Sequence, residues 1–140
     1  MHNLFRRYGV ELIIFAVTAA LFGFAALGDL DPHHDGVMLK PAADVAAGKI
    51  LFRDTFTQYG FLTVFLQAFA IKLGGATLWT IRASTVLFYA LSAVLLYRIW
   101  GRVLKNRYRW TVIALFWLLP AFYMPQWTFL AWSSVYALFF

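Results

Sequence analysis

Cysteine is absent from the 140 residues, and acidic residues are scarce, with six aspartates and glutamates against twelve lysines and arginines. The absence of cysteine excludes disulfides and thiolate metal ligands. Charged residues of either sign make up only 13% of the chain, whereas 63% is hydrophobic. Soluble domains are typically ~45–50% apolar. The composition therefore predicts a chain whose main solvent is lipid.

The net charge of +6 is concentrated in two places, at Arg6 and Arg7 and in the run RIWGRVLKNRYR at residues 98–109. Both places border long apolar stretches, a pattern that sets membrane orientation and does not indicate a nucleic-acid partner. The first apolar stretch lacks the small-residue cleavage site of a removable signal peptide. We therefore expect it to be retained as a membrane anchor.

Three apolar stretches precede the second basic cluster. Residues 12–28 and residues 79–100 are each long enough to cross a hydrocarbon core of ~30 Å, and the second carries tryptophan at both ends. Residues 61–71 form a run of only about 11 residues, which is short for a span. We interpret this run as interfacial or re-entrant.

The positive-inside rule requires both basic clusters to face the cytoplasm, and hence an even number of crossings between them. The sequence therefore predicts an all-α, multi-pass protein of the cytoplasmic (inner) membrane with a cytoplasmic amino terminus. Residues 29–78 are the predicted extracytoplasmic loop, which carries juxtamembrane helices. The last apolar stretch, residues 110–140, is expected to hold one span and the start of another. Residues 1–140 then form a single membrane domain, expected to be the amino-terminal portion of a larger module.

The predicted loop holds five of the six acids of the chain, namely Asp29, Asp31, Asp35, Asp44 and Asp54. Within it, residues 37–47 place apolar side chains on one helical face and charges on another, which is typical of a helix at a membrane surface. An acidic loop held close to lipid headgroups suits chemistry on a lipid-linked substrate.

The stretch GDLDPHHDGVMLKPAADVAAGKILFRDTFTQYG, followed by an apolar helix, LGG and a span that opens with Ile81-Arg82, resembles the amino-terminal part of GT-C glycosyltransferases. Protein mannosyltransferases and aminoarabinose transferases belong to this superfamily. The resemblance implies transfer of a sugar, with inversion, from a polyprenyl-phosphate-linked donor to an extracytoplasmic acceptor that the sequence does not identify. In the family an Asp-Glu pair often stands in the loop, whereas Gly36 follows Asp35 here.

Asp35 and Asp54 are the predicted catalytic residues. Asp35 is the preferred general base, since a carboxylate at the start of the loop can take a proton from an acceptor hydroxyl or amine. Its alternative role is to cap a helix that starts near Val37. The alternative for Asp54 is a loop salt bridge with Arg53. Gln58 and Tyr59 are the predicted substrate-binding residues, as hydrogen-bond partners of a sugar or phosphate.

Arg82 and Arg53 are the predicted ligands of the donor phosphate, because a guanidinium binds phosphate in a bidentate contact. Anchoring to ordinary membrane lipids is the alternative for Arg82, and Lys72 is a further weak candidate of this kind. A divalent metal is the one cofactor that the loop suggests, with His33 and His34 as ligands beside nearby aspartates. Adjacent histidines need not converge on one ion, however.

Two other function classes remain open at this point. One is a non-catalytic small integral membrane protein or subunit, in which the loop and the spans are present without a working site. The other is a transporter or channel component, which requires ionisable residues inside the spans. Such residues are nearly absent apart from Glu11 and Arg82 at the predicted boundaries.

Overall fold

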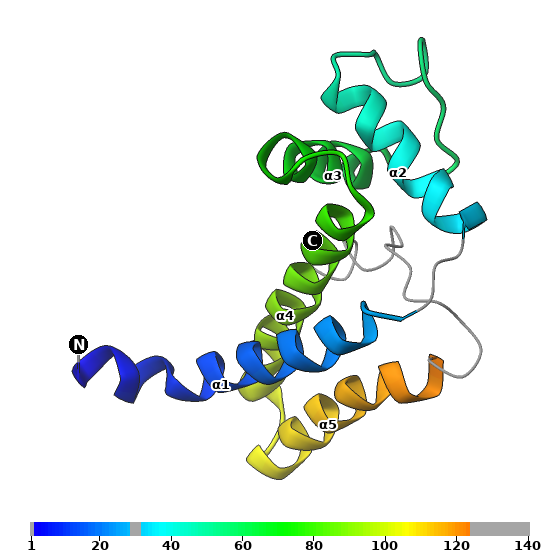
Figure 1. The fold of residues 1–140 in the computed structure, drawn as a ribbon. Coiled ribbons are helices and arrows are strands. Elements are labelled where there is room, and N and C mark those ends of the chain that lie inside the picture. The colour runs from blue at the N-terminus through cyan, green and yellow to red at the C-terminus, as the bar shows by residue number, and fades with distance from the viewer. Residues whose placement is uncertain (1, 29–31, 124–140) are drawn as a thin grey trace.

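The computed structural model describes residues 2–28 and 32–123, and this part of the chain contains five helices and no β-strand (Figure 1). In chain order the helices are α1 (His2–Ala25), α2 (Pro32–Ala46), α3 (Phe61–Gly74), α4 (Leu78–Val103) and α5 (Asn106–Tyr123). The predicted all-α class is confirmed.

Helices α1 and α4 are the two described helices that are long and apolar enough to cross a membrane. The apolar part of α1 is Tyr8–Ala25, with a mean hydropathy of 1.9, and that of α4 is the whole helix, with 1.5. Thr77 caps α4, since its hydroxyl accepts a hydrogen bond from the backbone N–H of Thr80 at 3.2 Å. Helix α4 extends beyond the predicted span at both ends, whereas α1 begins before residue 12 but ends at Ala25, three residues before the predicted end.

Helices α1 and α4 run in opposite directions. Arg82, near the start of α4, donates a hydrogen bond to the carbonyl of Ala26, just after α1, at 2.8 Å. At the other end of α4, Arg98 donates to the Glu11 carboxylate at 2.9 Å. These two contacts join the end of each helix to the start of the other.

Helix α5 returns along this pair. The Trp117 indole donates a hydrogen bond to the Thr18 hydroxyl of α1 at 2.9 Å. Phe22 stacks on Tyr89 of α4 with ring centroids 4.0 Å apart, and Phe116 packs beside both rings. Helix α5 begins at Asn106, within the basic run, and continues to Tyr123, so it includes Pro120. The rest of the predicted final span, residues 124–140, lies outside the described residues.

Helices α2 and α3 pack on each other beyond the amino-terminal end of α4 (Figure 1). The core between α2, α3 and the start of α4 consists of Met38, Ala42, Ile71 and Ile81. At ~1.5 Å per residue, the 14 residues of α3 extend about 21 Å, short of the ~30 Å of a hydrocarbon core. This length agrees with the interfacial interpretation of residues 61–71.

Helix α2 begins at Pro32, five positions before the predicted start. Proline suits the first turn of a helix, where a backbone N–H has no partner within the helix. Asp35 consequently lies inside the first turn of α2. Its predicted alternative role as the cap of a helix starting near Val37 is therefore wrong.

Candidate functional site

The most deeply buried ion pair of the described residues joins Asp35 of α2 to Arg82 of α4. The Arg82 Nη2 donates to the Asp35 Oδ2 at 3.0 Å, and the two side chains are only 1% and 7% exposed. Sequence analysis gave these residues separate roles, on the acceptor and on the donor phosphate. The structure brings them into direct contact.

Arg82 also holds the end of α1. Its Nη1 donates to the carbonyl oxygens of Ala26 and Gly28 at 2.8 and 3.1 Å. The last carbonyls of a helix have no partner within the helix and carry partial negative charge, so a cation is favourable there. The Trp79 ring lies 5.7 Å from the guanidinium carbon. One side chain thus connects α1, α2 and α4.

The junction formed by Asp35 and Arg82 provides two chemical groups. Both are needed to transfer a group from a phosphate-linked donor to an acceptor. A carboxylate can accept a proton, and a planar guanidinium can bind phosphate oxygens in a bidentate contact. Burial strengthens both interactions, because the local dielectric is lower than that of water. The same burial also makes it costly for either group to lose its partner.

Asp54 lies in the turn that follows α2. Its carboxylate binds Arg53 through two contacts of 2.9 Å and accepts the backbone N–H of Ile50 at 2.9 Å. These contacts, that of Arg53 first, lower the pKa of Asp54. The predicted loop salt bridge is therefore present.

The Asp54 turn follows the carboxyl end of α2, whereas Asp35 is in its first turn, so most of α2 separates them along the chain (Figure 1). Asp35 and Arg82 are thus brought together, while Asp54 and Arg53 form a separate pair. Tyr59 is half-buried and packs against the core of α2 and α3. Gln58 is exposed.

The two predicted metal ligands, His33 and His34, lie on the first turn of α2. Their rings meet edge to face with centroids 5.2 Å apart. Asp31, one of the acids expected to assist them, lies outside the described residues. Within residues 2–28 and 32–123, no group of three or more histidine, aspartate or glutamate side chains is placed to hold a metal ion.

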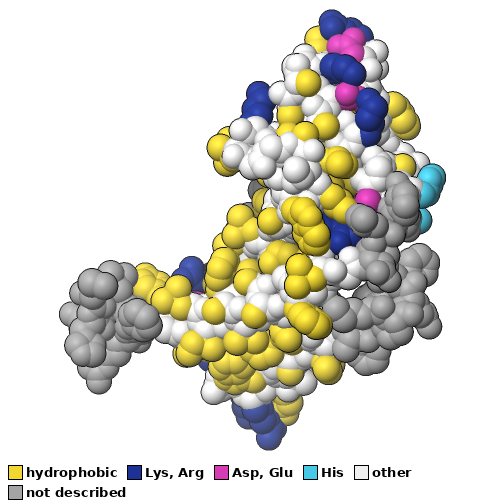
Figure 2. Space-filling view, in the orientation of Figure 1, with side chains coloured by type: hydrophobic (Ala, Val, Ile, Leu, Met, Phe, Trp, Pro, Cys, Tyr) yellow, Lys and Arg dark blue, Asp and Glu magenta, His cyan; other side chains and the backbone are white. Residues whose placement is uncertain are grey.

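Charged contacts that sequence analysis missed lie at both ends of the molecule. Asp44 binds Lys40 at 2.5 Å and Lys49 at 2.8 Å, and these two lysines lower its pKa. Figure 2 shows charges of both signs gathered over this loop end. The four-residue spacing of Lys40 and Asp44 was a usable signal. The pairing of Glu11 with Arg98 had no local signal, because 87 positions separate them.

Comparison with protein-family models, with curated proteins and with solved structures finds no match to this chain.

Proposed function

We propose that this chain is a membrane glycosyltransferase, or the amino-terminal part of one, that transfers a sugar from a polyprenyl-phosphate-linked donor to an extracytoplasmic acceptor. The observation that carries the proposal is the convergence of Asp35 and Arg82, 47 positions apart in sequence, at one end of two membrane-length helices. The sequence resemblance to GT-C enzymes, which includes both residues, is the second support.

The arrangement of α1 and α4 supports a specific placement in the membrane. The pair Glu11–Arg98 and the basic turn lie at one end of these helices, and the pair Asp35–Arg82 lies at the other. The positive-inside rule assigns the basic end to the cytoplasm. Asp35, Arg82 and the unit formed by α2 and α3 then lie at the outer surface, where a lipid-linked sugar and its acceptor can meet.

In the proposed reaction the acceptor oxygen or nitrogen attacks the anomeric carbon of the donor sugar. The bond between that carbon and the phosphate oxygen breaks, and the electron pair leaves with polyprenyl phosphate. Asp35 takes the proton from the acceptor. Arg82 stabilises the negative charge that grows on the phosphate. Attack opposite to the leaving phosphate inverts the anomeric configuration.

The contact between the two residues implies an exchange when the donor binds. Arg82 uses Nη1 for the carbonyls of Ala26 and Gly28 and Nη2 for Asp35. A phosphate that replaced the carboxylate at Nη2 would leave the guanidinium anchored by Nη1. The displaced carboxylate would then be released for proton transfer. Donor binding and activation of the base are thus coupled in this proposal.

The test is donor consumption by membranes that contain the chain. Polyprenyl phosphates carrying different hexoses and pentoses are supplied, and release of polyprenyl phosphate is measured. Asp35→Asn is expected to lower release by at least about 100-fold, the usual contribution of a general base. Asp54→Asn is the matched control and is expected to keep most of the activity. Equal loss in both variants, or release unaffected by Asp35→Asn, would contradict the proposed role of Asp35.

One observation favours a second candidate, a non-catalytic membrane protein in which the same pair is a structural clamp. Arg82 is 1% exposed and joins its own helix, α4, to α2 and to the end of α1, as a clamp requires. This reading predicts no release of polyprenyl phosphate with any donor. It also predicts that variants of Asp35 and Arg82 alter stability alone.

A further inference from the structure

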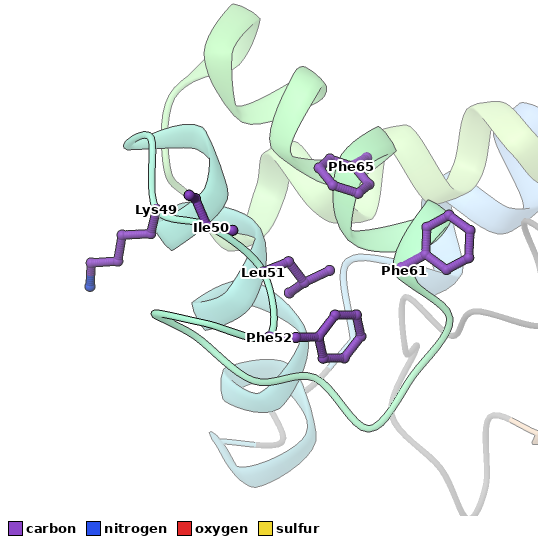
Figure 3. A pocket seen from close by; sticks show the side chains of 6 residues that line it. All are labelled: Lys49, Ile50, Leu51, Phe52, Phe61 and Phe65. Carbon is purple, nitrogen blue, oxygen red and sulfur yellow. The ribbon is translucent and has the colours of Figure 1, made fainter.

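A cleft opens between α3 and the loop that follows α2, apart from the Asp35–Arg82 junction. Its volume is about 310 Å³, at the lower end of the ~300–1,000 Å³ of small-molecule sites. The residues that line it are Lys49, Ile50, Leu51, Phe52, Phe61 and Phe65 (Figure 3). Five of these six side chains are apolar, so the cleft favours a hydrocarbon ligand.

The polarity of the cleft changes from one edge to the other. Figure 3 shows the rings of Phe52, Phe61 and Phe65 on one side. Lys49 stands at the opposite edge and extends its ammonium group away from the rings. Lys49 binds Asp44 with one of its three N–H donors, and Asp44 also binds Lys40, so two cations share one carboxylate. An apolar interior with a cationic rim matches an anionic amphiphile.

Helix α3, which forms one wall of the cleft, exposes large apolar side chains, while its buried residues are both polar and apolar. Its polar residues Thr63 and Gln67 are buried against the protein. Its large apolar residues Phe61, Phe65 and Phe69 are exposed. Water would penalise such a face, whereas lipid favours it. The cleft therefore opens beside a surface suited to acyl chains.

The loop wall holds an exposed phenylalanine in an uncommon backbone conformation. Phe52 has a φ of +67°, a region that bulky residues rarely adopt, and its side chain is 62% exposed. The turn that holds it is closed by hydrogen bonds from Phe52 N–H to the Thr55 carbonyl and from Asp54 N–H to the Ile50 carbonyl, both at 2.8 Å. Asp54 thus helps to hold the loop that forms this wall of the cleft.

We propose that the cleft binds one anionic glycerophospholipid of the outer leaflet, with an acyl chain between the phenylalanine rings and the phosphate at Lys49. Three observations support this occupant: the apolar lining, the cationic edge, and the continuity of the cleft with the outward apolar face of α3. The inference rests on the membrane placement proposed above and is independent of sugar transfer. Its tests therefore measure lipid binding and not turnover.

The first test measures charge preference. The full chain is purified in detergent and titrated with dioleoyl phosphatidylglycerol or dioleoyl phosphatidylcholine, and bound lipids are counted by native mass spectrometry. The first phosphatidylglycerol is expected to bind about fivefold more tightly than phosphatidylcholine. Lys49→Gln should remove this preference. Lys40→Gln is the matched control, because Lys40 also binds Asp44 but does not line the cleft, and it should keep the preference.

The second test fills the cleft. Leu51→Trp should abolish tight binding of the first lipid, whereas Leu73→Trp, on the exposed end of α3 outside the cleft, should not. Three results would overturn the proposal. These are an equal effect of Lys49→Gln and Lys40→Gln, retained binding in a folded Leu51→Trp variant, and displacement of phosphatidylglycerol by an equimolar polyprenyl phosphate.

Discussion

The junction of α2 with α4 and the turn after α2 each contain one arginine–aspartate pair, yet the two pairs differ in nearly everything else. Asp35 and Arg82 come from different helices and are almost fully buried. Arg53 and Asp54 are neighbours in sequence, and the Arg53 side chain is 68% exposed. The same kind of ion pair thus occurs twice. One pair is buried and joins residues far apart in sequence, and the other is exposed and joins neighbours.

The difference shows what burial adds to an ion pair. Water screens an exposed pair, and its partners are easily replaced by solvent. A buried pair loses hydration on both sides, so each member depends on the other and on additional hydrogen bonds. The carbonyls of Ala26 and Gly28 supply those bonds for Arg82. We therefore expect the junction, and not the turn, to control both stability and chemistry.

The largest predicted effect is that of Arg82→Ala. It leaves the buried Asp35 carboxylate without its cation and should destabilise the protein by ~3–5 kcal/mol. Thermal unfolding in detergent, followed by helical circular dichroism, measures the change. Arg53→Ala is the control in the exposed pair and should unfold close to the wild type. The contrast between the two pairs would be lost if both variants shifted unfolding equally.

A double replacement separates the structural role of the junction from its proposed chemistry. Asp35→Leu combined with Arg82→Met removes both charges and fills the space with apolar side chains, so most of the stability lost in Arg82→Ala should return. Release of polyprenyl phosphate should not return. A stable and active double variant would remove both residues from the proposed mechanism.

An intermediate effect is expected on the loop side, as a dependence of stability on pH. Lys40 and Lys49 hold the pKa of Asp44 well below its ordinary value of 3.8. A depressed carboxyl pKa contributes stability that is fully present above the unfolded value and is lost as the pH falls below it. Wild-type stability should therefore decline from pH 4 downward. The stability of Asp44→Asn should decline less as the pH falls. A decline equal to that of the wild type would contradict a stabilising role of the Asp44 ion pairs.

The smallest effect is predicted for a neutral buried contact between helices. Thr18 accepts a hydrogen bond from the Trp117 indole and donates one to the carbonyl of Ile14. Thr18→Val keeps the shape and removes the hydroxyl, which should cost about 0.6 kcal/mol, the average for such bonds between membrane helices. The same unfolding measurement applies. If Thr18→Val lost as much stability as Arg82→Ala, the large effect at the junction could not be attributed to its buried charges.

Local patterns predicted most of the helices and the local charge pairs. The apolar runs at residues 61–71 and 79–100 each became part of a helix, as did residues 12–25 of the first run, because apolar length is a property of the run itself. The contact of Arg53 with Asp54 was equally readable, since the residues are adjacent. The start of α2 was missed because a proline and two histidines were interpreted as loop.

The long-range contacts could not be predicted in the same way. The contact between Asp35 and Arg82 depends on how α2 and α4 are oriented relative to each other, and no local sequence pattern specifies that orientation. The inward placement of Thr63 and Gln67 depends on which face of α3 meets α2. Both features arise from packing between helices. Sequence analysis therefore identified Asp35 and Arg82 as candidate site residues but did not predict that they are in contact.

The central claim is that α1 and α4 cross the membrane and place α2, α3 and the Asp35–Arg82 junction together on its outer surface. Single cysteines at Gly36, Ala76 and Asn106, in a chain without native cysteine, test it with a membrane-impermeant thiol reagent on intact cells. Positions 36 and 76 flank α3 in sequence, and both are exposed. The account predicts labelling at 36 and 76 but not at 106. Labelling at 36 and 106 but not at 76 would mean that α3 crosses the membrane, which would contradict the proposed placement.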